Sequence, residues 1–199
     1  MKKFQNVDAK SLIPSGSTPG KMYGLIKAHK QHYAARLIVS MISTPEYKLA
    51  KFLDSLIKPY MPDRYMLKST DQFIDILRNS PLNDSKIMVS FDAVSLFTNV
   101  PLKETIEIIA DYIYNDKNCC IPIQRPTFTK LMQLATQGMF LYKNKLYKQI
   151  DGVAMGSPLG PTLANFFLAH IENSILNKHA SFHPKIYARY VDDIFCYFF

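Results

Sequence analysis

The chain has 199 residues, of which 48% are hydrophobic and 20% charged, a composition that excludes a disordered tail and allows a buried core. An excess of 24 Lys and Arg over 16 Asp and Glu gives a formal net charge of +8, which makes nucleic acid the first candidate partner and an anionic membrane the second. Three cysteines without CxxC spacing, and an N-terminus without an apolar signal segment, favour a reduced, intracellular protein.

The first part of the chain predicts a loop, a β-hairpin and two helices. Residues 11–20 are rich in Ser, Gly and Pro and indicate the loop. The segments KMYGLIKAHK and ARLIVSMIS alternate basic and apolar residues, which predicts two strands that turn around residues 28–35. Residues 43–61 open with Ser-Thr-Pro-Glu and continue with apolar residues at helical spacing, and residues 69–79 also indicate a helix.

The second part predicts more helices between strands. Residues 86–102, KIMVSFDAVSLFTNVPL, begin as a buried strand that breaks at residues 99–101. Helices are predicted over 103–115, 126–139 and 161–177, and a hairpin with a polar tip at 143–145 over 139–152. The last stretch is a strand pair that turns near Asp192. Because helices and strands mix without regular βαβα alternation, the predicted fold class is α+β.

One uncharged stretch needs a separate interpretation. Residues 152–171 contain no Asp, Glu, Lys or Arg and are long enough to span a bilayer. The stretch also contains three glycines, two prolines and Asn165, which favours a turn that leads into a buried helix. No membrane partner is therefore predicted.

Three aspartates interrupt apolar segments. Asp92 ends IMVSF, and Asp192 and Asp193 are adjacent within YARYVDDIFCYFF. A buried carboxylate requires a cation or hydrogen-bond donors, and if the strands are neighbours, the three acids meet at one point. Arg189 is the only basic residue in these segments, so a divalent metal is the natural counter-charge. Mg²⁺ prefers one or two carboxylates with water and phosphates, and two ions about 3.5–4 Å apart can clamp a phosphoryl transfer. The alternative is an exposed turn with solvated acids.

Five segments, in this order, resemble the reverse transcriptase family: YGLIKAHK, ARLIVS, FDAVSLFTNVP, GVAMGSPLGPTLANFFL and YVDD. They are most similar to the Penelope-like retroelement branch, over residues 22 to 199. The resemblance implies a right-hand polymerase, with an N-terminal loop segment (1–20), a fingers-like part (21–85) and a truncated palm part (86–199) whose antiparallel sheet packs on helices. Because the chain ends just past YVDD, we expect a fragment whose thumb is missing.

The resemblance also implies roles for single residues. Asp92 and Asp192 are expected to hold two Mg²⁺ ions, with Mn²⁺ as an alternative, and Asp193, the partner acid of Asp192, is expected to be the third metal-site and catalytic residue. Phe97 is expected to exclude the ribose 2′-OH by steric clash, although a core position is its alternative. The other nucleotide contacts are expected from Arg36 at the triphosphate, Lys27 at triphosphate or template, and Met155 and Gly156 at the nascent base pair. Template and primer contacts are expected from Lys30, Gly152, Ser157, Pro158 and Tyr190.

The predicted function is RNA-directed DNA polymerisation, in which a DNA primer on an RNA template is extended with deoxynucleoside triphosphates. Three alternatives remain: an inactive remnant that binds nucleic acid, an RNA-directed RNA polymerase, and an unrelated α+β interaction domain. Ile26 and Leu37 stand where the family usually has Pro, and Gly160 where it often has Ser, departures that affect rigidity and not the metal ligands. The resemblance implies a nuclear location, with the cytoplasm as the alternative, and leaves the oligomeric state open.

Overall fold

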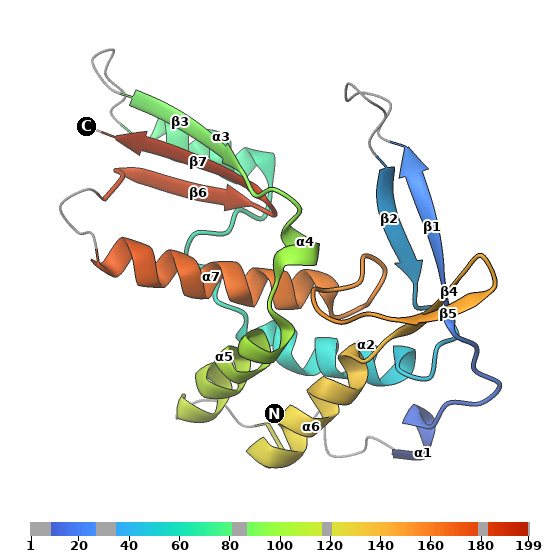
Figure 1. The fold of residues 1–199 in the computed structure, drawn as a ribbon. Helices are drawn as coiled ribbons and strands as arrows, with labels where there is room; N and C mark the ends of the chain where they lie inside the picture. Colours follow the sequence, from blue (N-terminus) through green and yellow to red (C-terminus); the bar gives the residue numbers. More distant parts are fainter. Residues whose placement is uncertain (1–8, 27–34, 81–86, 117–120, 179–182, 199) are drawn as a thin grey trace. The chain divides into compact units, whose positions relative to one another are not determined.

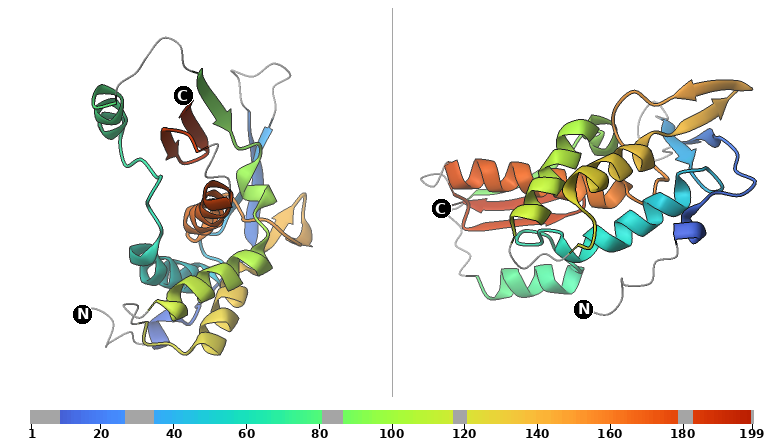
Figure 2. Two further views of the ribbon diagram at one scale, coloured as in Figure 1. Left: turned by 90° about the vertical axis from the view of Figure 1, so that its left-hand side faces the viewer. Right: turned by 90° about the horizontal axis from the view of Figure 1, so that it is seen from below.

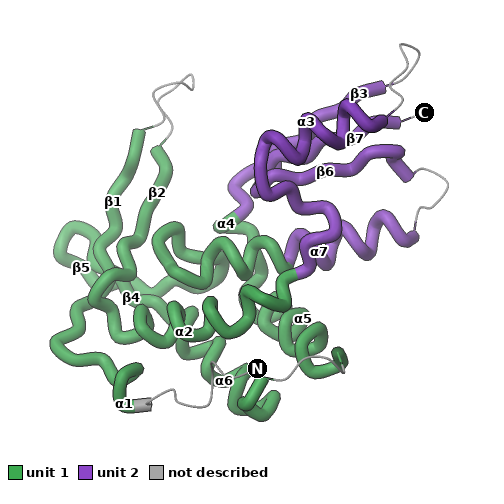
Figure 3. Tube along the Cα trace, turned by 180° about the vertical axis from the view of Figure 1, so that it is seen from behind, with its two compact units in different colours: residues 1–61, 97–166 green, residues 62–96, 167–199 purple. Residues whose placement is uncertain are grey.

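The computed structural model describes residues 9–26, 35–80, 87–116, 121–178 and 183–198; Figures 1 and 2 show its elements from three sides. The chain divides into two compact units (Figure 3): unit 1 comprises residues 1–61 and 97–166, and unit 2 comprises residues 62–96 and 167–199. Each unit combines helices with its own β-sheet, so the predicted α+β class is confirmed. The predicted boundary between residues 85 and 86 lies outside the described residues.

Unit 1 has a helical core. The helices α2 (Tyr47–Ile57), α5 (Leu102–Asn115) and α6 (Arg125–Thr136) follow the predicted segments, and α6 contacts both of the others. The short α1 (Ala9–Leu12) and the 3-10 turn η1 (Lys58–Tyr60) lie next to α2. Each large apolar side chain buried here contributes about 1.5–3 kcal/mol. The fully covered ones include Leu53, Leu56, Ile57, Ile109, Ile113, Phe128 and Met132.

The sheet of unit 1 has the strand order β2-β1-β4-β5. The strands β1 (Gly20–Ile26) and β2 (Ala35–Ser40) are antiparallel, as are β4 (Met139–Tyr142) and β5 (Lys145–Lys148), so the predicted strand pairing of both hairpins is confirmed. The predicted turn of the first hairpin, around residues 28–35, lies outside the described residues except for Ala35. Only Lys143 and Asn144, with φ of 48° and 62°, form the tip of the second hairpin, and the predicted third tip residue begins β5. A parallel pairing between β1 and β4 joins the two hairpins.

The sheet of unit 2 is antiparallel, with the order β3 (Ile87–Asp92), β7 (Asp193–Phe198), β6 (Ile186–Tyr190). On one face, α3 (Thr70–Arg78) packs Phe73, Ile76 and Leu77 against β6 and β7. The Ser69 side chain caps α3 by accepting from the Gln72 N–H at 3.2 Å. The opposite face meets α7 (Gly160–Lys178), whose residues after 166 belong to this unit. The predicted antiparallel sheet packed on helices is therefore confirmed.

Two details of the prediction for residues 86–102 are wrong. The strand β3 ends at Asp92, and residues 96–99 form the short helix α4 (Leu96–Asn99) instead of extending the strand. The strand is also not buried, because Ile87 and Met88 are each 65% exposed. Its apolar composition identified a strand, but β3 occupies an edge of the sheet, and the apolar cluster under α3 is built on β6 and β7.

The uncharged stretch 152–171 is a turn followed by a helix, as predicted. The helix α7 begins at Gly160, and Leu163 and Phe166 are buried within unit 1. Among the described residues, no helix has both the length and the apolar composition required to cross a membrane.

Candidate active site

The three aspartates lie together at one end of the unit 2 sheet. Asp92 ends β3 and is the register partner of Asp193, which begins β7. Asp192 lies in the two-residue turn between β6 and β7, and its carbonyl accepts a hydrogen bond from the Ala93 N–H at 3.1 Å. The expectation that the acidic segments are neighbouring strands is confirmed. Their pairing places Asp92, Asp192 and Asp193 at the same end of the sheet, which is called the acidic edge below.

This acidic edge is open to solvent. Asp92 and Asp193 are exposed, and Asp192 is half-buried. Tyr190 is the partner of Asp193 on the other side, so Tyr190, Asp193 and Asp92 form one row across the three strands and share a face. Tyr190 is 52% exposed. A hollow of about 290 Å³ opens beside this row, between the sheet and the first turn of α3 near Thr70.

The donor chemistry of the acidic edge fits a hard divalent cation, because its side-chain ligand atoms are carboxylate oxygens. Within the described part of the chain, no three His, Cys, Asp or Glu side chains are grouped closely enough to hold a metal ion by themselves. Mg²⁺ commonly takes one or two carboxylates and completes its shell with water and substrate phosphates. The paired Asp92 and Asp193, with Asp192 in the adjacent turn, fit such a partial ligand set.

The side chain of Arg189 is paired with Glu172 of α7. This side chain is buried, and its Nε donates to Glu172 Oε1 at 2.6 Å while a second nitrogen, Nη2, lies 3.3 Å from Oε2. The Tyr187 hydroxyl donates to the same Oε1 at 3.1 Å. Burial, with a smaller contribution from Glu172, raises the pKa of the Tyr187 hydroxyl. The sequence placed Arg189 near the acids, but only the fold shows that its charge is directed to α7.

In unit 1, residues 149–160 form a loop fixed at several points. The Asp151 carboxylate accepts from the backbone N–H groups of Leu102 at 3.1 Å and Gly152 at 2.8 Å. The Val153 N–H donates to the Phe97 carbonyl at 2.6 Å, and the Met155 carbonyl accepts from Val39 of β2 at 3.0 Å. These bonds attach the loop to α4, α5 and β2.

Two glycines in this loop permit close backbone contacts. Gly152 has a φ of +75°, and a Cβ there would lie 2.7 Å from the Thr98 carbonyl oxygen. Gly156 has a φ of +129°, and a Cβ there would overlap the Val39 carbonyl. Any side chain at Gly156 would therefore force the loop away from β2.

The remaining predicted site residues fall into four groups. Met155, Ser157 and Pro158 are half-buried in the loop, and the Ser157 carbonyl accepts from the Gly160 N–H at 3.0 Å, at the start of α7. The half-buried Phe97 has its ring 3.4 Å from where a Cβ on Gly160 would lie, so it lies against the start of α7. Arg36 is exposed on β2. Lys27 and Lys30 lie outside the described residues.

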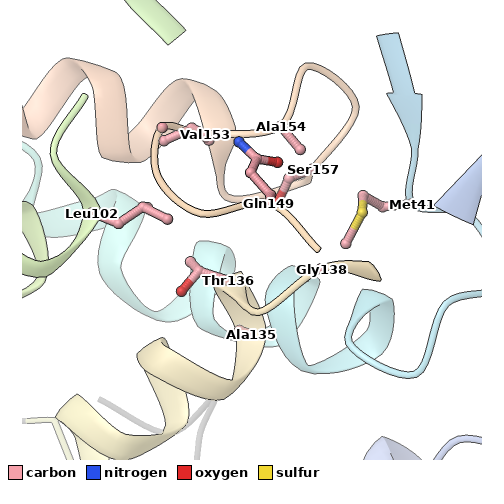
Figure 4. A pocket seen from close by; sticks show the side chains of 10 residues that line it. Met41, Leu102, Ala135, Thr136, Gly138, Gln149, Val153, Ala154 and Ser157 are labelled. Atoms are coloured by element: carbon pink, nitrogen blue, oxygen red, sulfur yellow. The ribbon is translucent and has the colours of Figure 1, made fainter. Parts of the chain in front are cut away.

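A small cavity lies beside the same loop (Figure 4). Gln149, Thr136 and Ser157 contribute polar groups, and Met41 and Leu102 contribute apolar ones. Its volume of about 10 Å³ is near the minimum for a single water molecule. The cavity is a packing feature of the loop and too small for a nucleotide.

Two features were missed by the motif analysis. One is the pairing of Arg189 with Glu172, for which the sequence contains no local signal. The other is the aromatic and basic surface of the predicted β4–β5 hairpin, where Phe140 stacks on Tyr147 at 5.8 Å between ring centroids and the Lys143 Nζ lies 5.5 Å from the centroid of the Tyr142 ring. The alternation of Tyr and Lys in YKNKLYK was a usable signal for this surface, since aromatic and basic residues together are typical of single-strand nucleic-acid binding.

Comparison with known proteins extends these observations. The profile of the family described as reverse transcriptase (RNA-dependent DNA polymerase) matches residues 28–198. No curated protein matches the chain. The fold is similar to telomerase from Candida albicans in complex with a fragment of telomeric RNA, with a TM-score of 0.62 and 11% identity over 96% of this chain and 39% of that chain.

Two further solved structures share the fold. Apo telomerase from Candida tropicalis, truncated from its C-terminal domain, gives a TM-score of 0.60 and 18% identity over 91% of this chain and 44% of that chain. The BmCPV RNA-dependent RNA polymerase at its elongation state gives 0.60 and 14% identity over 91% of this chain and 18% of that chain. The chain thus spans less than half the length of each of these three proteins.

Proposed function

Because the chain belongs to the reverse transcriptase family, we propose that it carries the acidic centre of an RNA-directed DNA polymerase. The observation that carries the proposal is the pairing of Asp92 with Asp193 beside the Asp192 turn, at the solvent-open end of an antiparallel sheet. The strings SLFTNVP and AMGSPL support a retroelement of the Penelope-like branch as the source, and hence a nuclear site of action.

In this proposal the acidic edge holds the metal and the primer end. When bound, Mg²⁺, or Mn²⁺ in its place, would supply positive charge that favours ionisation of the primer 3′-OH and stabilises the leaving pyrophosphate. Asp92 and Asp192 provide carboxylate ligands from a strand end and a turn, and Asp193 adds negative charge beside them. The primer 3′-hydroxyl gives its proton to water, its oxygen forms a bond to the α-phosphorus of a deoxynucleoside triphosphate, and the bond from that phosphorus to pyrophosphate breaks.

Unit 1 supplies most of the proposed substrate contacts, and unit 2 adds Tyr190. The exposed Arg36 suits a triphosphate, because a guanidinium can donate two hydrogen bonds to phosphate oxygens. Met155 and Gly156 stand in a loop whose backbone position is fixed by β2, which suits close approach to a base pair. Phe97 is proposed to exclude the ribose 2′-OH. Lys27 is assigned to the triphosphate or template, and the template–primer contacts to Lys30, Gly152, Ser157, Pro158 and Tyr190.

The proposed partners are an RNA template and a DNA primer. The formal net charge of +8 supports binding to a polyanion, so affinity is expected to fall steeply as salt rises. The second candidate is an RNA-directed RNA polymerase, because the BmCPV enzyme shares the fold. Phe97 favours the DNA polymerase, and Phe97→Ala is expected to admit ribonucleotides if its ring excludes the 2′-OH.

Primer extension tests the proposal. Each protein is incubated with an RNA template, a DNA primer, deoxynucleotides and Mg²⁺. The amount of extended primer is compared among the parent, Asp192→Asn and Asp75→Asn. Asp75 is an exposed acid of α3 in the same unit, so its variant makes the same charge change away from the acidic edge. We expect extension with the parent and Asp75→Asn, and none with Asp192→Asn. Extension that survives in Asp192→Asn would refute the assignment, and salt-sensitive template binding without extension would favour the non-polymerising remnant.

A further inference from the structure

A bidentate ion pair is buried in unit 2 next to the acidic turn. Arg189 is 0% exposed and Glu172 is 5% exposed. Arginine is almost never fully buried unless it is paired, and desolvation offsets much of what a buried pair gains in attraction. Stability alone is therefore a weak reason for this arrangement.

The same guanidinium also reaches the turn. Its third nitrogen, Nη1, donates to the Val191 carbonyl at 3.0 Å. Arg189 thus connects the carboxylate of Glu172 on α7 to the residue that immediately precedes Asp192. A lysine has one nitrogen on a flexible chain and cannot reproduce this planar set of donors.

The turn needs such support, because Val191 has a φ of +58°. Left-handed backbone is unfavourable for a β-branched residue, and a residue held there costs about 1–3 kcal/mol unless the surroundings enforce it. The backbone of Arg189 is itself fixed, since its N–H donates to the Tyr65 carbonyl at 2.8 Å and its carbonyl accepts from Leu67 at 2.7 Å. The Arg189 guanidinium is therefore attached to a backbone whose position is fixed on both sides.

We propose that Arg189, oriented by Glu172, is a positioning residue that holds the left-handed turn and with it the Asp192 carboxylate beside Asp92 and Asp193. The positioning role of Arg189 is inferred from contacts within unit 2 alone. Its consequence for polymerisation rests on the proposed function, because it requires that Asp192 take part in catalysis.

Three variants separate positioning from simple stabilisation. Arg189→Met leaves Glu172 buried without its partner and is expected to lower the melting temperature strongly. The double variant Arg189→Met/Glu172→Leu removes both charges, and such apolar replacements of buried pairs are often neutral or stabilising. Tyr187→Phe is the matched control, because it removes the other hydrogen bond to Glu172 Oε1 and makes no change at the turn.

The first readout is amide hydrogen exchange at Ala93, whose N–H donates to the Asp192 carbonyl and so reports the turn without any catalytic assay. In the double variant we expect a melting temperature near that of the parent, but Ala93 exchange about tenfold faster, the effect of losing one hydrogen bond to a charged group. Tyr187→Phe should leave Ala93 exchange unchanged.

The second readout is primer extension, where the double variant should lose kcat at least about tenfold with the KM for deoxynucleotides unchanged. If it recovers melting temperature, Ala93 exchange and kcat together, the pair is structural only and the inference is overturned. If the parent itself does not extend a primer, the proposed function fails, and Ala93 exchange still decides whether Arg189 holds the turn.

Discussion

Gly156→Ala is expected to detach the 152–157 loop from β2. At Gly156 the backbone has a φ of +129°, which L residues rarely adopt, and the added Cβ would overlap the Val39 carbonyl. The loop must then move, and the hydrogen bond from the Val39 N–H to the Met155 carbonyl is lost.

The magnitude follows from these two effects. Holding a non-glycine residue in such a backbone conformation costs about 1–3 kcal/mol, and loss of one backbone hydrogen bond costs about 1 kcal/mol. Gly156→Ala should therefore lower the free energy of unfolding by about 2–4 kcal/mol. At this chain length each kcal/mol corresponds to about 2–4 °C in melting temperature.

Gly16→Ala is the matched control, since Gly16 lies in the same unit with a φ of +62° and has no atom within 4 Å of an added Cβ. Gly16→Ala should therefore lower the free energy of unfolding only by the cost of the left-handed backbone, about 1–2 kcal/mol. Gly152→Ala would place a Cβ 2.7 Å from the Thr98 carbonyl oxygen, so it should lower the free energy of unfolding more than Gly16→Ala does. Urea unfolding followed by far-UV circular dichroism measures all three. If Gly156→Ala loses no more stability than Gly16→Ala, the close contact between the loop and β2 is wrong.

Three further predictions concern other parts of the chain. Burial and Glu172 raise the pKa of Tyr187, so as pH rises above the ordinary value of 10.0 the unfolded state loses this proton before the folded state does. The free energy of unfolding should therefore fall above pH 10. The urea midpoint of Tyr187→Phe should fall less than that of the parent over the same pH range. Burial, and then Glu172, raise the pKa of the Cys196 thiol, so iodoacetamide at pH 8 should alkylate Cys196 more than about tenfold slower in the native protein than in the urea-unfolded chain. Mass spectrometry of the Cys196 peptide separates it from Cys119 and Cys120, and equal rates at Cys196 would contradict its burial. The double variant Tyr142→Ala/Tyr147→Ala should bind single-stranded RNA more weakly by about 1–3 kcal/mol per lost stacking contact, and blunt duplex RNA with unchanged affinity. Fluorescence anisotropy measures both affinities, and equal losses for single-stranded and duplex RNA would exclude base stacking on the hairpin.

Local patterns determined most of the secondary structure. The spacing of Ile106, Ile109 and Ile113 predicted a helix over 103–115, and α5 spans Leu102–Asn115. The Tyr- and Leu-rich arms around Lys143-Asn144 predicted the hairpin that forms β4 and β5. These elements were predictable because helical spacing, strand alternation and turn residues act over a few neighbouring positions.

The placement of the acids was partly predictable. Apolar flanks around Asp92 and around Asp192–Asp193 indicated two strands interrupted by charge, and the family resemblance indicated that these strands are neighbours. The register of Asp92 with Asp193, and the position of Asp192 in a left-handed turn after Val191, came from the structure.

The sequence by itself determined most of the longer elements, their order and the residues that carry negative charge at the candidate site. Only the tertiary structure decided that β3 is an exposed edge strand, that β1 pairs with β4, and that Arg189 donates to Glu172 and to the Val191 carbonyl. The physical reason is that a backbone preference depends on adjacent residues, whereas the partner of a strand edge or a buried charge is selected by packing among segments distant in the chain.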